Sequence, residues 1–215
     1  MSKTILYIGM SLDGCIAGPN DDLSWLDEYQ DVDYEYNDFF STVGSLIQGR
    51  RTYDIEVQKG WVGVHPVPNF VLSKNTPKDI PKDYHFVSGD LKKVLEQAKE
   101  AAGEKNVWIE GGASVAQQFI NKGLVDEIVL TIVPKILGSG IRLFDNIQEF
   151  HRFSLTDVKR FEKGLVQLTY EGDIAQQRII MAYNLVIVPS EVVIETVIIH
   201  GDAGAVNGAI KTNQD

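Results

Sequence analysis

The chain has 215 residues, of which 44% are hydrophobic and 23% charged, and its formal net charge is −10. This length suits one sizeable domain, and the composition is that of a folded protein rather than a disordered one. The acidic balance argues against nucleic acid as a partner, because a phosphate backbone would be repelled. A small anion can still bind where a few cations and backbone N–H groups converge.

Cysteine content and apolar runs bear on location. The single cysteine, Cys15, excludes an intramolecular disulfide and fits a reducing compartment. The first apolar run ends at Asp13, which is too early for a signal peptide, and no run reaches the roughly 20 residues of a membrane span. We therefore expect a cytoplasmic protein with no membrane partner.

The first half of the chain shows alternating strand and helix patterns. Periodicity and turn residues predict, in chain order, a strand at Lys3–Met10, a loop to about Trp25, a helix at Asp33–Val43, a strand at Ser45–Ile47, a helix at Arg50–Val57, and strands at Asn69–Ser73 and Tyr84–Ser88.

The second half continues the alternation and closes with two strands in succession. The same reasoning predicts a helix capped by Asp90 and running through Ala102, a strand at Asn106–Ile109, a helix at Ala113–Lys122, and strands at Asp126–Val133, Phe153–Lys159 and Gly164–Tyr170. Alternation followed by a hairpin predicts an α/β fold: a mixed, mostly parallel central sheet with helices on both faces and a C-terminal antiparallel hairpin.

Residues 172–215 differ in composition and pattern from the domain expected over residues 1–171. Two β-branched runs, Ile179–Val188 and Val192–Ile199, are separated by Pro189-Ser190 and followed by a polar, glycine- and alanine-rich end. We interpret this segment as an appendage of unknown role, in the form of a hairpin that adds to the sheet edge or crosses to a second subunit.

Three short motifs bring cations, hydroxyls or exposed backbone N–H groups to strand ends, where open α/β sheets bind ligands. In Gly49-Arg50-Arg51-Thr52-Tyr53, a glycine turn leads into a helix start beside two arginines and a hydroxyl, which suits a phosphate. The alternative is a pair of solvated arginines.

The other two motifs have simple structural alternatives as well. Leu72-Ser73-Lys74 places a hydroxyl and an ammonium group at a strand end, and it would otherwise be ordinary surface. Glu110-Gly111-Gly112-Ala113-Ser114 combines paired glycines, which allow close approach of a ligand, with the positive end of a helix; paired glycines are also common turns.

Taken together and in order, these motifs resemble the dihydrofolate reductase superfamily, and in particular the branch with the C-terminal reductase domain of the riboflavin-biosynthesis deaminase-reductase (RibD). The resemblance covers roughly residues 3–171. It also draws on the segments Ser11–Ala17, Gly123–Glu127, Pro134 and Leu137–Gly140.

The resemblance implies the dihydrofolate reductase-like three-layer fold, NADPH as cofactor and a homodimer. The residues that match the family's cofactor segments are Ile16, Ala17, Gly49, Arg50, Arg51, Thr52, Leu72, Ser73, Lys74, Gly111, Gly112, Ala113, Ser114 and Val115. The cations favour NADPH over NADH, because a 2′-phosphate needs them. The resemblance also implies a cis peptide between Gly111 and Gly112.

The proton source is where the chain departs from authentic dihydrofolate reductases, because their Trp-then-acid pattern is not clearly reproduced around Trp25. The resemblance leaves two catalytic candidates, Asp13 and Asp33, and makes Trp25 a substrate-pocket candidate. Asp13 can equally shape a turn, Asp33 can cap its helix and Trp25 can be a core aromatic. The four histidines lack metal-ligand spacing, so we predict no metal.

We therefore predict an NADPH-dependent oxidoreductase that transfers hydride to a pteridine, pyrimidine or flavin precursor. Its activity would resemble 5-amino-6-(5-phosphoribosylamino)uracil reductase or dihydrofolate reductase. Two alternatives stay open: a catalytically inactive nucleotide-binding or sensing protein on the same fold, and a structural oligomer in which the C-terminal appendage is the functional part.

Overall fold

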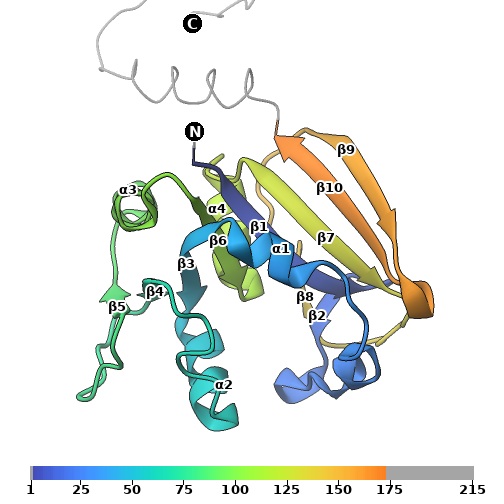
Figure 1. Cartoon of the computed structure of the whole chain (residues 1–215), viewed down its shortest axis with the longest axis horizontal. Helices are drawn as coiled ribbons and strands as arrows, with labels where there is room; N and C mark the ends of the chain where they lie inside the picture. Colours follow the sequence, from blue (N-terminus) through green and yellow to red (C-terminus); the bar gives the residue numbers. More distant parts are fainter. Residues whose placement is uncertain (1, 173–215) are drawn as a thin grey trace, which may run out of the picture.

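The protein is described by a computed structural model over residues 2–172, and these residues form an eight-stranded sheet (Figure 1). Its order is β5-β4-β3-β6-β1-β7-β10-β9, in which neighbours from β5 to β7 are parallel and β10 and β9 are added antiparallel. A separate small pairing joins β2 to β8. The strands are β1 Thr4–Ser11, β2 Cys15–Ala17, β3 Val43–Gly49, β4 Asn69–Leu72, β5 Tyr84–Val87, β6 Asn106–Gly111, β7 Glu127–Val133, β8 Ile141–Arg142, β9 Phe153–Arg160 and β10 Val166–Gly172.

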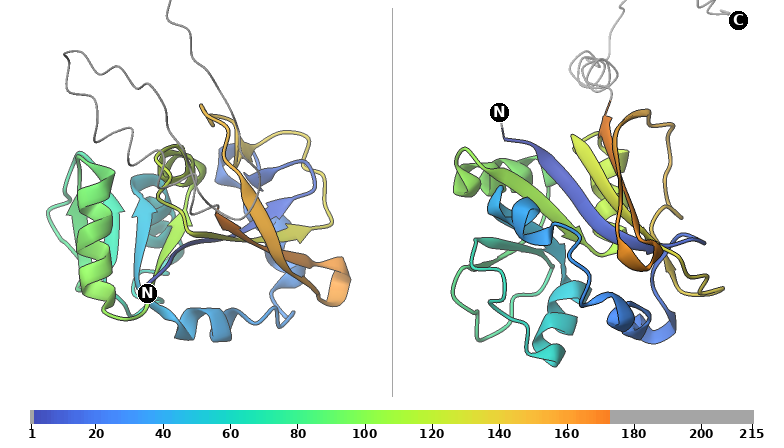
Figure 2. Two further views of the ribbon diagram at one scale, coloured as in Figure 1. Left: turned by 90° about the horizontal axis from the view of Figure 1, so that it is seen from above. Right: turned by 45° about the vertical axis from the view of Figure 1, so that its right-hand side comes forward.

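Helices cover both faces of this sheet. The α-helices are α1 Tyr36–Ser41, α2 Arg50–Lys59, α3 Leu91–Ala102 and α4 Ala113–Asn121, and short 3₁₀ helices lie at Pro19–Asp21 (η1), Ser24–Tyr29 (η2) and Glu162–Gly164 (η3). Figure 2 shows α1 and α4 on opposite sides of the sheet. None of the helices in residues 2–172 is long and apolar enough to cross a membrane.

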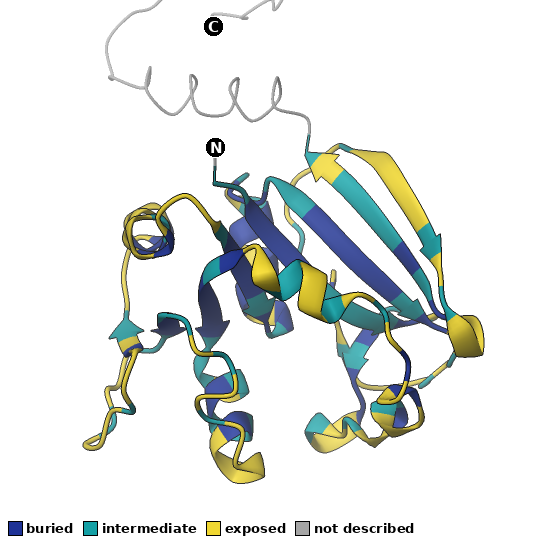
Figure 3. Ribbon diagram, in the orientation of Figure 1, coloured by how far each residue is buried: buried dark blue, intermediate teal, exposed yellow. Residues whose placement is uncertain are grey.

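Side chains of β1 alternate between the two cores, as the period of a strand requires. Leu6 belongs to the core under α3 and α4, whereas Ile5 and Tyr7 belong to the aromatic core under α1. Burial is concentrated in the central strands and is low along the edge strand β9 (Figure 3). The core of the sheet therefore lies at its central strands.

The predicted fold class is confirmed, and each predicted strand and helix is found within a few residues of its expected ends, whereas the short strands β2 and β8 were not predicted. The helix predicted at Asp33–Val43 is wrong at both ends: α1 spans Tyr36–Ser41, and Val43 already belongs to β3. The cause at the start is local, because Glu35 adopts a left-handed φ of 61° and donates its N–H to the Asp33 carboxylate at 3.0 Å. The appendage predicted at 172–215 lies outside the described residues after Gly172.

Candidate functional site

The three motifs singled out in the sequence lie together at one edge of the sheet. Because β3, β4 and β6 are parallel neighbours, their carboxyl ends share that edge. In the register, Gly49 stands opposite Leu72, and Gln48 stands opposite Gly111. The first and third glycine motifs are thus neighbours in space although about 60 residues separate them in the sequence.

Close backbone approach defines the centre of this edge. A Cβ at Gly49 would lie 3.0 Å from a methyl of Val115 and 3.7 Å from the carbonyl oxygen of Gly111. A Cβ at Gly112 would lie 3.5 Å from the Thr52 hydroxyl. The Gly111-Gly112 peptide is cis, as predicted. The two glycine turns therefore lie in contact and form one cradle, and α2 and α4 begin directly after them, where the first N–H groups of a helix have no partner within the helix.

Cationic and hydroxyl groups gather beside the cradle at the end of β4. Arg50 donates from Nη1 to the carbonyl oxygen of Asn75 at 3.2 Å, and the Ser73 hydroxyl donates to the same oxygen at 2.7 Å. Lys74, between Ser73 and Asn75 in the sequence, is exposed. The first and second motifs are thus brought together, and Arg50 is further held by Asp54 at 2.8 Å. This cluster has the cations that a nucleotide phosphate requires.

A cavity of about 1150 Å³ opens next to the cradle, between the end of β1, the η1–η2 segment, α2 and β6. Aromatic side chains of Tyr7, Tyr34, Tyr36 and Trp108 line it. Arg51 lines it as well, and its Nε lies 2.7 Å from the Asp21 carboxylate. We call this cavity the cleft.

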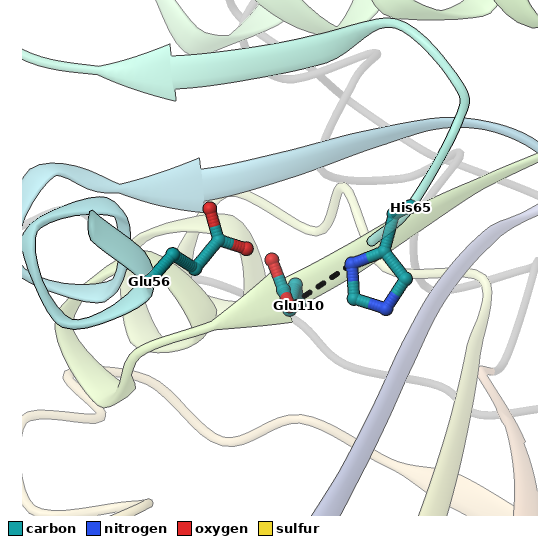
Figure 4. Close-up of side chains that lie close together, drawn as sticks. All are labelled: Glu56, His65 and Glu110. Atoms are coloured by element: carbon teal, nitrogen blue, oxygen red, sulfur yellow. Dashed lines mark ion pairs between the residues drawn. The ribbon is translucent and has the colours of Figure 1, made fainter. Parts of the chain in front are cut away.

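The side chains of Glu56, Glu110 and His65 point toward one another, and Glu110 lies between the other two (Figure 4). Glu110 and His65 line the cleft. The distance from His65 Nδ1 to Glu110 Oε1 is 3.7 Å, and Glu110 Oε2 is buried without a hydrogen-bond partner. Glu56 Oε2, in contrast, accepts from Gln48 at 3.0 Å and from Tyr84 at 3.2 Å.

These surroundings set the protonation of the cluster. Burial, together with the charge of Glu56, raises the pKa of Glu110 to about 8. Burial also raises the pKa of Glu56 and lowers that of His65. Glu110 is therefore largely a neutral acid at pH 7, with one oxygen unpaired beside the cleft. A carboxyl group in this state can donate a proton.

Tyr36 fixes the ring of His65. Its hydroxyl lies 2.7 Å from His65 Nε2, and burial raises the Tyr36 pKa to about 12, so the phenol keeps its proton. When the phenol donates to Nε2, the neutral ring carries its own proton on Nδ1, which faces Glu110. His65 can thereby stabilise the carboxylate that forms when Glu110 releases its proton.

Sequence spacing did not reveal this cluster. Glu56, His65 and Glu110 each offer one ligand atom, and these atoms lie within 4.8 Å of one another. They come from α2, from the loop after it and from β6, so no short motif contains them. Glu56 already accepts two hydrogen bonds and His65 is held by Tyr36, an arrangement that also suits a proton-handling site. The absence of a metal stays a prediction.

The catalytic and substrate candidates from the sequence are not among the residues that line the cleft. The Asp13 carboxylate accepts from the Ser11 hydroxyl at 2.6 Å and from the N–H groups of Leu137 and Gly138 at 3.0 and 2.7 Å. These hydrogen bonds, of which the one from Ser11 has the largest effect, lower the pKa of Asp13 to about 2. Asp13 is thus a saturated carboxylate that shapes the turn and has no proton to donate near pH 7.

Asp33 and Trp25 are likewise not among the residues that line the cleft. Asp33 is exposed and closes the turn before α1, although the residue at the N-cap is Glu35 and not Asp33 as expected. Trp25 is 7% exposed and packs in a core cluster with Tyr29 and Val133. The turn and core interpretations given for Asp13 and Trp25 therefore account for their positions, whereas Asp33 closes the turn before α1 and does not cap the helix.

Two further candidates, Ile16 and Ala17, belong to the short strand β2, which pairs with β8. A Cβ at Gly140 would lie 2.1 Å from the carbonyl oxygen of Ala17, so this pairing requires glycine there. Neither Ile16 nor Ala17 is among the cleft-lining residues. Among the sequence candidates, Arg51 alone lines the cleft.

Comparisons with known proteins agree with this architecture. A family model described as the RibD C-terminal domain matches residues 2–167. The uncharacterized protein YwjB of Bacillus subtilis is 36% identical over 172 residues, which covers 78% of this chain and 97% of the relative. A putative riboflavin biosynthesis protein from Shewanella sp. PV-4 superposes with a TM-score of 0.70 at 30% identity, over 80% of this chain and 99% of that one.

A more distant structure shows the fold alone. The deaminase and 5-amino-6-(5-phosphoribosylamino)uracil reductase of Thermotoga maritima gives a TM-score of 0.60 at 14% identity, over 80% of this chain and 57% of that one.

Proposed function

The chain belongs to the RibD C-terminal domain family, and we propose that it is an NADPH-dependent reductase that delivers hydride to a small planar ring of the pteridine, pyrimidine or flavin-precursor type. The cofactor dependence and the substrate are both part of this proposal. The observation that supports it most strongly is the contact of the two glycine turns, at Gly49 and Gly111-Gly112, beside Arg50 and Lys74.

The described residues fit NADPH on two grounds. A Cβ at Gly49 would partly fill the cradle, which is what a backbone cradle for a pyrophosphate requires. Arg50, Ser73 and Lys74 then supply charge and hydrogen bonds for a 2′-phosphate. When bound, NADPH supplies the hydride.

This chain's own residues would orient the substrate and supply a proton. The aromatic side chains of Tyr36 and Trp108 would hold a flat ring in the cleft. Glu110, protonated at neutral pH, would donate from its carboxyl oxygen to a ring nitrogen as hydride arrives on the adjacent carbon. His65 would then stabilise the Glu110 carboxylate through Nδ1.

The experiment is to follow NADPH oxidation at 340 nm with a panel of dihydropterins and aminopyrimidines, with NADPH affinity measured in parallel. We expect turnover of at least one compound and loss of turnover in Glu110→Gln, with NADPH affinity unchanged. Tight NADPH binding without turnover of any compound would instead favour the nucleotide-binding or sensing alternative.

A further inference from the structure

The cleft has an unusual balance of charges for a protein whose family relatives include a reductase of a phosphoribosyl substrate. Besides Glu110, which is largely neutral at pH 7, four carboxylates line it against two basic side chains. The carboxylates are Asp21, Asp22, Asp27 and Asp54, of which Asp54 is paired with Arg50 from outside the cleft. From this balance, and resting on the reductase function above, we propose that the cleft selects a neutral or cationic nitrogen heterocycle and rejects ring substrates that carry phosphate or carboxylate groups.

The two basic side chains are already occupied by neighbours. Arg51 is paired with Asp21, with Nε and Oδ1 2.7 Å apart. Lys59 Nζ lies 6.0 Å above the ring of Trp61, and its charge adds to the hydrogen bonds from Ser24 that lower the pKa of Asp22. A substrate phosphate entering the cleft would therefore lose hydration and meet mainly like charge, without the paired cations that phosphate sites use.

Anion recognition is placed elsewhere in the described chain. Arg50, Ser73 and Lys74 stand at the ends of β3 and β4, beside the cradle, and none of them lines the cleft. The site is thus divided into a cationic end for the cofactor phosphates and an acidic end for the substrate. A phosphorylated substrate would have to compete with the cofactor for the same cations.

The walls of the cleft suit a flat, electron-poor ring. The centroids of the Tyr36 and Trp108 rings lie 6.2 Å apart, and those of Tyr7 and Trp108 lie 6.3 Å apart. Aromatic faces attract planar heterocycles and cations alike. Glu110, which lines the cleft, offers a carboxyl group as hydrogen-bond partner for a ring nitrogen or an exocyclic amine. Carboxyl groups and aromatic faces therefore select for the same class of ligand.

The test uses two pairs of compounds that differ only in anionic groups. They are 7,8-dihydropterin against 6-carboxy-7,8-dihydropterin, and 5-amino-6-ribosylaminouracil against its 5′-phosphate. Dissociation constants are measured calorimetrically with oxidised cofactor present, and NADPH oxidation is measured separately. We expect the uncharged member of each pair to bind at least tenfold more tightly at 20 mM salt, with a smaller ratio at 300 mM because salt screens the repulsion.

A charge variant and its control sharpen the test. Asp27→Lys should tighten binding of the phosphorylated uracil several-fold relative to the ribosyl form, whereas Glu149→Lys, with the same charge change at an exposed position outside the cleft, should not. Equal or tighter binding of the anionic members in the wild type, or no binding of either uncharged compound, overturns the inference. Preferential binding without NADPH oxidation would keep the inference and reject the reductase function.

Discussion

His65 Nδ1 lies 3.7 Å from Glu110 Oε1 while Tyr36 holds the opposite nitrogen of the ring, so the imidazole is oriented toward a carboxyl group that lines the cleft. Such contacts are often long without ligand and shorten in the productive complex. His65 is therefore a positioning residue for Glu110.

The first prediction concerns His65→Phe, which keeps a ring but removes Nδ1–H. We expect kcat to fall about tenfold with KM unchanged, since roughly 1.4 kcal/mol of stabilisation of the Glu110 carboxylate is lost. The alkaline limb of the pH profile should move to higher pH, because the ionised form is less favoured. His85→Phe, outside the cleft, is the matched control. If kcat and the alkaline limb of the pH profile are unchanged in His65→Phe, then His65 does not assist Glu110.

The second prediction concerns the acid itself. With its pKa raised to about 8, Glu110 is protonated below that pH, so kcat/KM should decline as pH rises through about 8. Glu110→Gln should lower kcat by roughly 10² to 10⁴ and abolish this limb. Rate measurements from pH 6 to 9.5 test whether this decline in kcat/KM comes from Glu110. If the decline persists in Glu110→Gln, another group causes it.

The Glu110→Gln change, which should lower activity, should raise the stability of the fold. Between its ordinary value of 4.5 and about 8, the unfolded chain releases this proton while the folded chain retains it, so folding becomes less favourable as pH rises. The side chain is 15% exposed. Glu110→Gln should therefore be more stable than wild type by on the order of 3 kcal/mol at pH 7, an advantage that vanishes toward pH 4.5. Urea unfolding at both pH values tests this, and a less stable variant at pH 7 would contradict it.

The third prediction compares two glycines of β3. Gly49→Ala would place a methyl 3.0 Å from Val115 in the cradle, whereas Gly44→Ala would place one 2.4 Å from the carbonyl oxygen of Ala102, away from it. We expect Gly49→Ala to raise the NADPH dissociation constant at least tenfold. Gly44→Ala should instead cost roughly 1–3 kcal/mol of stability and leave NADPH affinity unchanged. Equal effects on affinity would contradict the cradle.

The fourth prediction concerns Asp13. Its lowered pKa means that its contribution to stability is present above the ordinary value of 3.8 and is lost as pH falls toward about 2. Asp13→Asn removes the charge that accepts from Leu137 and Gly138, so it should lower the melting temperature at pH 7. The shape of the kcat/KM profile above pH 6 should be kept. Lost turnover at an unchanged melting temperature would restore Asp13 as a catalytic candidate.

The residues proposed to bind the cofactor are largely predictable from the sequence because they stand at strand ends. Glycine after a strand, as at Gly49 and Gly111, marks a turn in the sequence itself, and parallel topology brings such turns to one edge. Arg50, Ser73 and Lys74 are predictable for the same reason, since each also lies just after a strand. Sequence within a few residues of each motif is enough to predict where these residues lie.

The substrate end was missed for two different reasons. Glu110 had a usable signal, because it lies two residues after Trp108 and alternation in a strand puts both side chains on the same face. His65 had none, since it belongs to an irregular segment between α2 and β4 whose path depends on tertiary packing. The hydrogen bonds that hold Asp13 could not be predicted from local sequence, because its two backbone donors lie more than 120 residues away.

Calorimetric affinities for NADPH and NADH test the central claim most directly, in wild type, in Arg50→Ala and in Lys93→Ala, which removes an exposed lysine of α3. The shared cradle predicts that the wild type prefers NADPH by tenfold or more, and that the preference collapses in Arg50→Ala alone. Equal affinity for both nucleotides in the wild type, or a preference that survives Arg50→Ala undiminished, would contradict it.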